Sequence, residues 1–157
     1  MKRTTLFTIL FVLPGMSAIV QADDRLTFGL GIGAPYSGIG VNVGLVSSKD
    51  LKFLSLGRVG GTGGGGDGAW GAGAGWVRTD LFSDKSSKHG VGLYLGQVTT
   101  KRSVDPGKDD VRGAYGAGLV YSYFLSGIGR SGLVLGLTPA IAESGRTALW
   151  FQLGYQF

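Results

Sequence analysis

The last eleven residues of the chain, Thr147 to Phe157, carry its most regular hydrophobic pattern. Large apolar side chains occupy every second position, and the residues between them form the opposite face. The apolar positions are Leu149, Phe151, Leu153, Tyr155 and Phe157. Successive side chains of a β-strand point to opposite faces, so this alternation predicts a strand with one apolar face. Its length fits the about 9 to 11 residues with which a tilted strand crosses a bilayer.

Seven further segments are predicted as strands, and short stretches of turn-forming residues separate them. The eight predicted strands cover residues 25–33, 39–47, 51–59, 69–81, 89–100, 111–125, 131–138 and 147–157. No helical apolar stretch occurs after residue 22. The prediction is therefore an all-β fold, an eight-stranded antiparallel up-and-down transmembrane β-barrel, because closure leaves no unpaired sheet edge in hydrocarbon.

The facing of two strands is less clear from the pattern. In 51–59, Leu54 and Leu56 share a face with Lys52 and Arg58, and both facings stay open. In 69–81, glycines alternate with larger residues that include Trp70 and Trp76. The favoured prediction places both tryptophans outward, with Arg78 and Asp80 on the same side near an interface, where a charge costs little.

The predicted connections alternate between the two ends of the barrel. The end that holds both chain termini has the connections 48–50, 83–88 and 126–130. The opposite end has the turn 34–38, the glycine-rich loop 60–68, the charged loop 101–110 and the loop 139–146. The second set is longer on the whole, as is usual for the outer side of such barrels.

Residues 1–22 have the pattern of a cleaved secretory signal peptide. Lys2 and Arg3 precede a short apolar run, and small residues such as Ala22 stand before Asp23. The apolar run is shorter than the about 20 residues of a spanning helix. The mature chain would then be a single domain of residues 23–157.

Composition restricts the function further. Without the leader, 13 basic residues stand against 10 acidic ones, a net charge of about +3 that is too small and too scattered to predict nucleic-acid binding. The chain has no cysteine, so no disulfide is expected. Glycine makes up 31 of the 157 residues, but it alternates with large apolar residues, which favours strands over disorder.

Aromatic residues gather where the interface at the terminal side is expected. They are Phe28, Phe53, Phe82, Tyr123, Tyr155 and Phe157. Aromatic rings suit the headgroup level of a membrane, so the pattern predicts an aromatic girdle.

Over residues 25–157 the chain resembles the small eight-stranded outer-membrane barrels of the OmpA and OmpX type. Gly154, Tyr155 and the terminal Phe157 match the C-terminal signal by which the outer-membrane assembly machinery recognises its clients. The resemblance implies a bacterial outer-membrane location with both termini in the periplasm. It also implies contact with outer-membrane lipids and lipopolysaccharide, and with assembly machinery and periplasmic chaperones during biogenesis.

No catalytic, metal or cofactor site is predicted, although some barrels of this architecture modify lipid A. The single histidine, His89, is followed by Gly90 and Val91, so the His-x-Ser pair of the deacylase-like family is absent. Asp84, Ser86 and Ser87 lie nearby, but on a turn assigned to the periplasmic side. Carboxylates on the outer loops could in principle bind a cation, but they more often keep a loop solvated. These are Asp105, Asp109, Asp110 and Glu143.

The interior is the remaining candidate site. Its predicted lining is mostly glycine, and Thr27 is one of the few larger residues on the same face. The other predicted lining residues are Arg25, Asn42, Tyr94, Arg112, Gly116, Gly118, Trp150 and Gln152. Either a cavity takes a small, partly apolar ligand, or Tyr94, Trp150 and the arginines fill the space. The leading hypothesis is a non-enzymatic outer-membrane protein with a structural or surface-interaction role, and a small-molecule barrel is the alternative.

Overall fold

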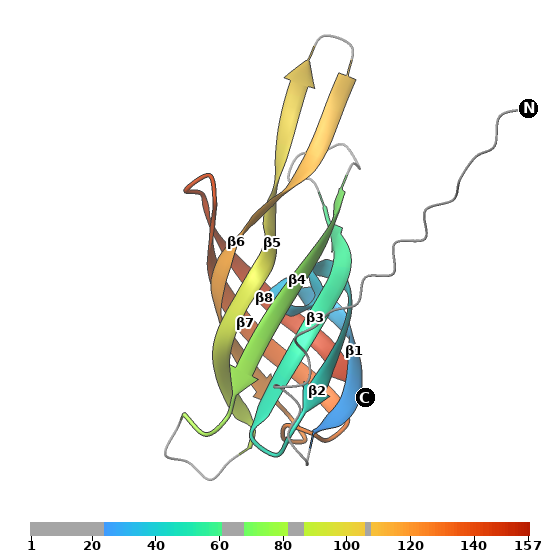
Figure 1. Cartoon of the computed structure of the whole chain (residues 1–157), viewed down its shortest axis with the longest axis vertical. Coiled ribbons are helices and arrows are strands. Elements are labelled where there is room, and N and C mark those ends of the chain that lie inside the picture. The colour runs from blue at the N-terminus through green and yellow to red at the C-terminus, as the bar shows by residue number, and fades with distance from the viewer. Residues whose placement is uncertain (1–23, 61–67, 82–86, 106–107) are drawn as a thin grey trace, which may run out of the picture.

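The computed structural model describes residues 24–60, 68–81, 87–105 and 108–157, which form a closed barrel of eight antiparallel strands (Figure 1). The predicted leader lies outside the described residues. The strands are β1 (Arg25–Gly33), β2 (Gly38–Val46), β3 (Asp50–Val59), β4 (Ala69–Arg78), β5 (His89–Asp105), β6 (Lys108–Phe124), β7 (Gly132–Ala142) and β8 (Thr147–Gln156). Each strand pairs with its neighbours in sequence, and β1 pairs with β8. The predicted all-β, eight-stranded antiparallel barrel is confirmed.

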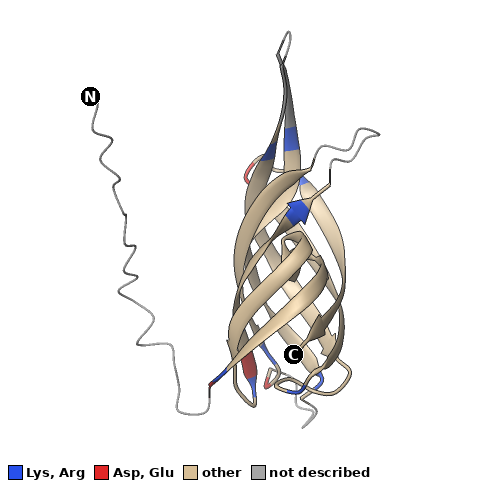
Figure 2. Ribbon diagram, turned by 90° about the vertical axis from the view of Figure 1, so that its right-hand side faces the viewer, with Lys and Arg blue, Asp and Glu red and all other residues tan. Residues whose placement is uncertain are grey.

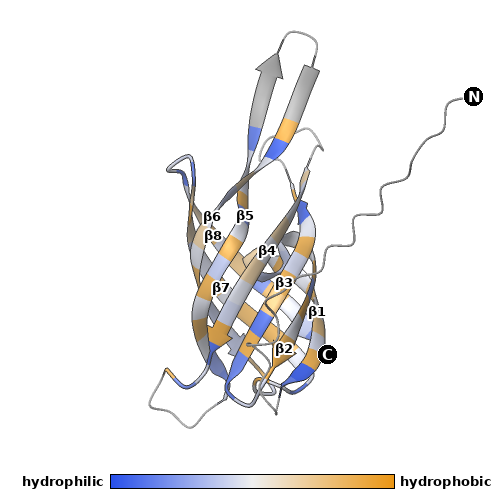
Figure 3. Ribbon diagram, in the orientation of Figure 1, coloured by the Kyte–Doolittle hydropathy of each residue, from blue (hydrophilic) through white to orange (hydrophobic). Residues whose placement is uncertain are grey.

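The large apolar side chains of the strands point outward. Figure 3 shows apolar and polar residues alternating along the strands. The open question for β3 is settled, because Leu54 and Leu56 are 55% and 53% exposed while Phe53 is buried. Phe53 therefore points inward and does not belong to the predicted aromatic girdle. Phe82, another member of that set, lies outside the described residues.

On β4 the favoured facing is confirmed. Trp70 and Trp76 point outward, with exposed fractions of 70% and 46%. Arg78 lies on the same face, and its Nε donates a hydrogen bond to Asp80 at 2.9 Å. The strand ends at Arg78 rather than at the predicted Leu81.

Two predicted loops are wrong because strands continue into them. The charged stretch 101–110 is paired from Lys101↔Arg112 to Asp105↔Lys108, so β5 and β6 project beyond the barrel as a two-stranded ribbon (Figure 1). Strands with water on both faces need no apolar face, so the hydrophobic pattern gives no signal there. We call this side of the barrel the ribbon end, and the side with Arg25 and Phe157 the terminal end.

The predicted loop 139–146 is also shorter in the structure, since β7 runs to Ala142 through Pro139. Proline lacks a backbone N–H and normally interrupts a strand pairing. Here Pro139 keeps its position opposite Leu149 on β8, while the β6–β7 pairs stop at Gly118↔Ala140 and resume at Tyr121↔Leu137. The break in one ladder accommodates the proline inside the strand.

The seam between β1 and β8 closes the barrel with four residue pairs, from Gly29↔Gln156 to Ile32↔Leu153. Contacts at the terminal end reinforce it. The rings of Phe28 and Phe157 stack with centroids 4.5 Å apart, and the Thr27 hydroxyl donates to the Phe157 main-chain oxygen at 2.7 Å. The Gln156 amide donates to the Thr27 hydroxyl at 2.9 Å. Thr27 therefore links both sides of the closing seam.

Replacing Thr27 with valine should weaken this seam. The change keeps the side-chain shape but removes the hydroxyl that donates to Phe157 and accepts from Gln156. We expect a loss of about 1–3 kcal/mol in the free energy of unfolding, measured by urea titration with tryptophan fluorescence. The partly exposed Thr100→Val on β5 is the control and should change it by less than about 0.5 kcal/mol. Equal effects of the two changes would contradict this role of Thr27.

Candidate functional site

The connection between β1 and β2 lies inside the barrel. The 3-10 helix η2 (Ala34–Tyr36) and Ser37 form a segment that we call the inner turn, and Ala34, Tyr36 and Ser37 are 0% exposed. Figure 1 shows this turn within the ring of strands, near β1 to β5 and β8. The turn at 34–38 follows β1 at the ribbon end, as the sequence predicts, but it folds into the barrel instead of projecting outward.

Glycines on the surrounding strands make room for the inner turn. A Cβ at Gly57 would lie 2.2 Å from the Tyr36 carbonyl oxygen, and one at Gly40 would lie 2.4 Å from it. A Cβ at Gly154 would lie 2.2 Å from the Tyr36 hydroxyl. These distances are shorter than any real contact of a Cβ. The glycine lining predicted from the sequence is thus occupied by a piece of the chain itself.

Hydrogen bonds hold the inner turn to the wall. The Ser37 hydroxyl is 2.8 Å from that of Ser55 on β3 and 3.2 Å from that of Tyr94 on β5. The Asn42 amide on β2 donates to the Pro35 carbonyl at 3.3 Å. Three different strands therefore contact the turn through uncharged polar groups.

The predicted lining residues separate into two sets. Asn42, Tyr94, Gly118 and Gln152 are buried in the interior, and Gly116 and Trp150 are partly buried. The two arginines are exposed at opposite ends instead. Arg25 donates a hydrogen bond to the Gly129 carbonyl at 2.9 Å at the terminal end. Arg112 lies opposite Lys101 in the β5–β6 ladder, at the base of the ribbon.

Residues that the sequence analysis did not single out fill much of the interior. Besides Tyr36, Ser37 and Ser55, Gln97 is 0% exposed and lies against Gly71 and Gly113. A bulge between Gln97 and Thr99 shifts the register of β5, which hides the inward position of Gln97 from a period-two pattern. Across the interior, the Trp150 indole N–H donates to the Val98 carbonyl at 2.8 Å.

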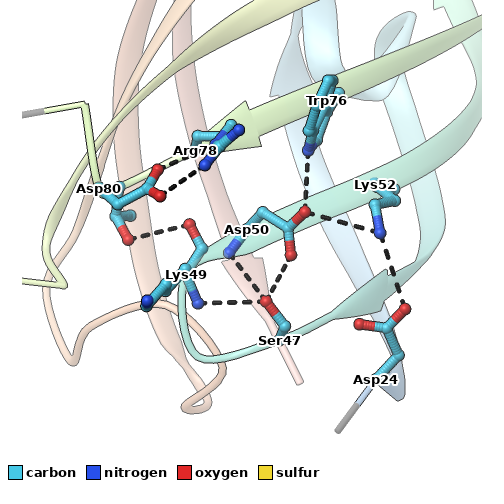
Figure 4. Close-up of polar contacts among 9 residues, drawn as sticks. Asp24, Ser47, Lys49, Asp50, Lys52, Trp76, Arg78 and Asp80 are labelled. Carbon is cyan, nitrogen blue, oxygen red and sulfur yellow. Dashed lines mark hydrogen bonds and ion pairs between the residues drawn. The ribbon is translucent and has the colours of Figure 1, made fainter. Parts of the chain in front are cut away.

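A second polar cluster lies on the outer face at the terminal end (Figure 4). The Trp76 indole N–H donates to Asp50 at 2.9 Å, and Lys52 lies between Asp50 and Asp24, at 3.6 and 3.7 Å. The hydrogen bond from Arg78 lowers the pKa of Asp80 below its usual range. In this cluster the cations and carboxylates neutralise one another, as expected of a solvated rim.

His89 begins β5 on the same side of the barrel. Its Nδ1 is 2.8 Å from the Tyr121 hydroxyl, and its ring centroid is 4.9 Å from that of Tyr123. Asp84 and Ser86, considered with it as a catalytic set, lie outside the described residues. His89 therefore contacts two aromatic residues of β6.

The outer-loop carboxylates show one described contact, between Glu143 and Lys101 at 2.7 Å. Within the described ranges, no group of three or more histidine, cysteine or acidic residues is placed to hold a metal ion. The side chains of Asp105, Asp109 and Asp110 are outside the description.

Comparisons with models of known protein families, with characterised proteins and with solved structures found no match for this chain. In the described residues, no helix is long and apolar enough to cross a membrane. The basis for assigning a function is therefore the barrel, its surface and its filled interior.

We call the space that the inner turn occupies, between Gly40, Gly57, Gly154, Ser55 and Tyr94, the seat of the turn. Substituting alanine for Gly57 should disturb this seat. The new Cβ would meet the backbone carbonyl oxygens of Tyr36, Ser37 and Ile39 at 2.2, 2.7 and 2.8 Å. A change of side-chain rotamer cannot relieve these clashes, so the closed turn is lost or strained, and we expect a loss of about 1–3 kcal/mol in the free energy of unfolding by urea titration.

Gly60→Ala is the matched control, because a Cβ there has nothing within 4 Å. It should be neutral or slightly stabilising. If Gly57→Ala is as mild as Gly60→Ala, the turn does not occupy the seat described.

Proposed function

We propose that this chain is an integral outer-membrane β-barrel protein with a structural or surface-interaction role and no catalytic activity. The observation that carries the proposal is the belt of large, exposed apolar side chains that surrounds the closed barrel. Every strand contributes to this belt. Examples, one from each strand from β1 to β8, are Leu30, Val41, Leu56, Trp70, Leu93, Leu119, Leu135 and Phe151. A soluble monomer rarely exposes apolar patches of more than a few hundred Å².

The distribution of charge supports the same proposal. Figure 2 shows the lysine, arginine, aspartate and glutamate residues toward the two ends, with an uncharged wall between them. Because the barrel is closed, its backbone groups pair within the wall, as hydrocarbon requires. A membrane covers such a belt, while water and headgroups solvate the two ends.

The orientation follows from the leader and the even strand number. Both termini lie in the periplasm, and the ribbon end faces outward, in contact with lipopolysaccharide. Gly154, Tyr155 and Phe157 serve as the assembly signal for the outer-membrane machinery, after delivery by periplasmic chaperones. In the folded barrel the Phe157 ring stacks on that of Phe28 beside the β1–β8 seam.

The projecting ribbon is the element best placed for surface interaction. β4 pairs with β5 only up to Gly96, and β7 pairs with β6 only from Gly116. Gln97 and Val98 are still buried in the barrel. From Lys101↔Arg112 to Asp105↔Lys108 the two strands pair only with each other, so both edges of the ribbon are free of neighbouring strands. A lipid A-modifying enzyme is the weaker alternative, because His89 is followed by Gly90 and Val91 and the chain lacks the His-x-Ser pair of the deacylase-like family.

An arginine placed in the apolar belt should test the membrane proposal. Leu119 is exposed in the middle portion of β6, and Leu26 is exposed next to the rim residue Arg25. For Leu119→Arg we expect a loss of about 2–4 kcal/mol, and for Leu26→Arg about 0–1 kcal/mol, in unfolding from phospholipid vesicles. A protein that folds in buffer without lipid or detergent, or equal effects of the two arginines, would contradict membrane insertion.

Removing the ribbon should separate surface interaction from barrel assembly. Deleting Lys101 to Asp110 joins the paired residues Thr100 and Gly113 through Val111 and Arg112 alone, and changing those two to Asn-Gly supplies a tight hairpin turn. We expect the barrel to keep its heat-modifiable mobility in gels, which reports that it has folded. We also expect fewer of the expressing cells to be retained on a protein-coated surface. Unchanged retention would contradict a role for the ribbon.

A further inference from the structure

The two halves of the interior are filled in different ways. Toward the terminal end, side chains of the strands and one turn fill the interior with apolar groups, among them Val46, Phe53, Val77, Val120, Phe124 and Ile128. The same cluster reaches the inner turn through Ala34 and Tyr94. Toward the ribbon end, the inner turn occupies the space between glycines. A wall side chain cannot leave the interior without unfolding its strand, whereas a connecting segment can.

The ends of the inner turn are suited to such a movement. Gly33 and Gly38 have φ values of 117° and 98° and face each other as the last pair of the β1–β2 ladder. The four residues between them can therefore move without breaking any pair of that ladder. Glycine tolerates positive φ, so both positions can change conformation at little steric cost.

Two features inside the turn are unfavourable in the closed position. Ser37 has φ 51°, a left-handed conformation that L-residues other than glycine rarely adopt. The Tyr36 hydroxyl is buried, and within the described residues no hydrogen bond of ordinary geometry satisfies it, although the Gln152 side chain interacts with it weakly. A buried hydroxyl with so weak a partner regains little of the hydration that it loses.

The seat around the turn is polar but uncharged. The buried polar residues on the described strands are serine, threonine, asparagine, glutamine and Tyr94. Such groups can form hydrogen bonds with a polar molecule, but they provide no counter-charge for an ion.

We propose that the inner turn is a displaceable plug and that the seat it leaves binds a small, uncharged, polar molecule entering from the ribbon end. The apolar core below the seat makes it a closed pocket rather than a passage. The seat's atoms come from the barrel itself, so the proposal does not depend on membrane insertion.

The experiment measures access to a thiol placed behind the plug. Ser55→Cys puts this thiol at the buried contact with Ser37, and the chain has no other cysteine. The folded, full-length mature chain in detergent is treated with methyl methanethiosulfonate, which is small and uncharged, or with its trimethylammonium analogue. Each rate is divided by the rate at which the same reagent modifies free cysteine, because a thiolate attracts the cationic reagent. We expect this normalised rate for Ser55→Cys to be at least about tenfold higher with the uncharged reagent, because the seat has no counter-charge.

Variants of Tyr36 relate this access to the plug. Tyr36→Ala removes the ring that fills the seat, so the rate of modification at position 55 should rise about tenfold or more. Tyr36→Phe keeps the ring and removes the weakly paired hydroxyl, so the closed position is favoured and the rate should fall. Neither change should affect Val134→Cys, a buried position in the apolar core that serves as the matched control.

Three results would overturn the proposal. One is a thiol in Ser55→Cys that is as unreactive as the thiol in Val134→Cys, which means that the turn stays in place. Another is an equal rise at both positions with Tyr36→Ala, which indicates general loosening of the barrel. The third is an equal normalised rate of modification of Ser55→Cys by the two reagents, which excludes a seat selective for uncharged molecules.

Discussion

An eight-stranded barrel encloses a space only wide enough for side chains, and every inward-facing residue of this protein has to share it. Large side chains fill the terminal half, where Phe53 and Phe124 belong to the apolar core. In the ribbon half, Gly40, Gly57 and Gly154 leave space that Tyr36 and its backbone occupy. The inward glycines and the inward turn therefore depend on each other: the glycines leave the space, and the turn fills it in the closed position.

The outer surface follows from the same closure. Once β1 and β8 pair, the wall has no open edge along its paired length, and its outward side chains can all be apolar. Polar contacts are then confined to the interior and to the two ends. At the terminal end, Asp50 bonds to Trp76, and Lys52 lies beside it. An aromatic ring with a nearby ion pair is typical of the boundary between an apolar and an aqueous phase.

The sequence was sufficient for the strand order, the closure and most strand facings, because period-two alternation reports directly which side chains share a face. It failed where a contact distant in sequence decided the structure. The residues Ala34 to Ser37 form a turn by local preference, but only the glycines of β2, β3 and β8 allow it to fold inward. Pro139 marked a loop by its missing N–H, and only the break in the β6–β7 ladder reveals that a strand tolerates it. Arg25 and Arg112 share a parity with interior residues, yet both lie beyond the interior, where solvent reaches them.

The energy terms of the inner turn are of similar size and opposite sign. Burying the Tyr36 ring contributes about 2–3 kcal/mol in favour of the closed position. The left-handed Ser37 opposes it by about 1–2 kcal/mol, and the weakly paired hydroxyl opposes it by about 1–3 kcal/mol. The hydrogen bonds of Ser37 and Asn42 add about 1 kcal/mol each to the closed side. Because the Gly33–Gly38 pair closes the hairpin in either position, the β1–β2 ladder contributes nothing to the difference. Within these ranges the closed position is favoured by at most about 3 kcal/mol, which keeps the seat filled at rest and leaves the open form within reach of a ligand that binds it.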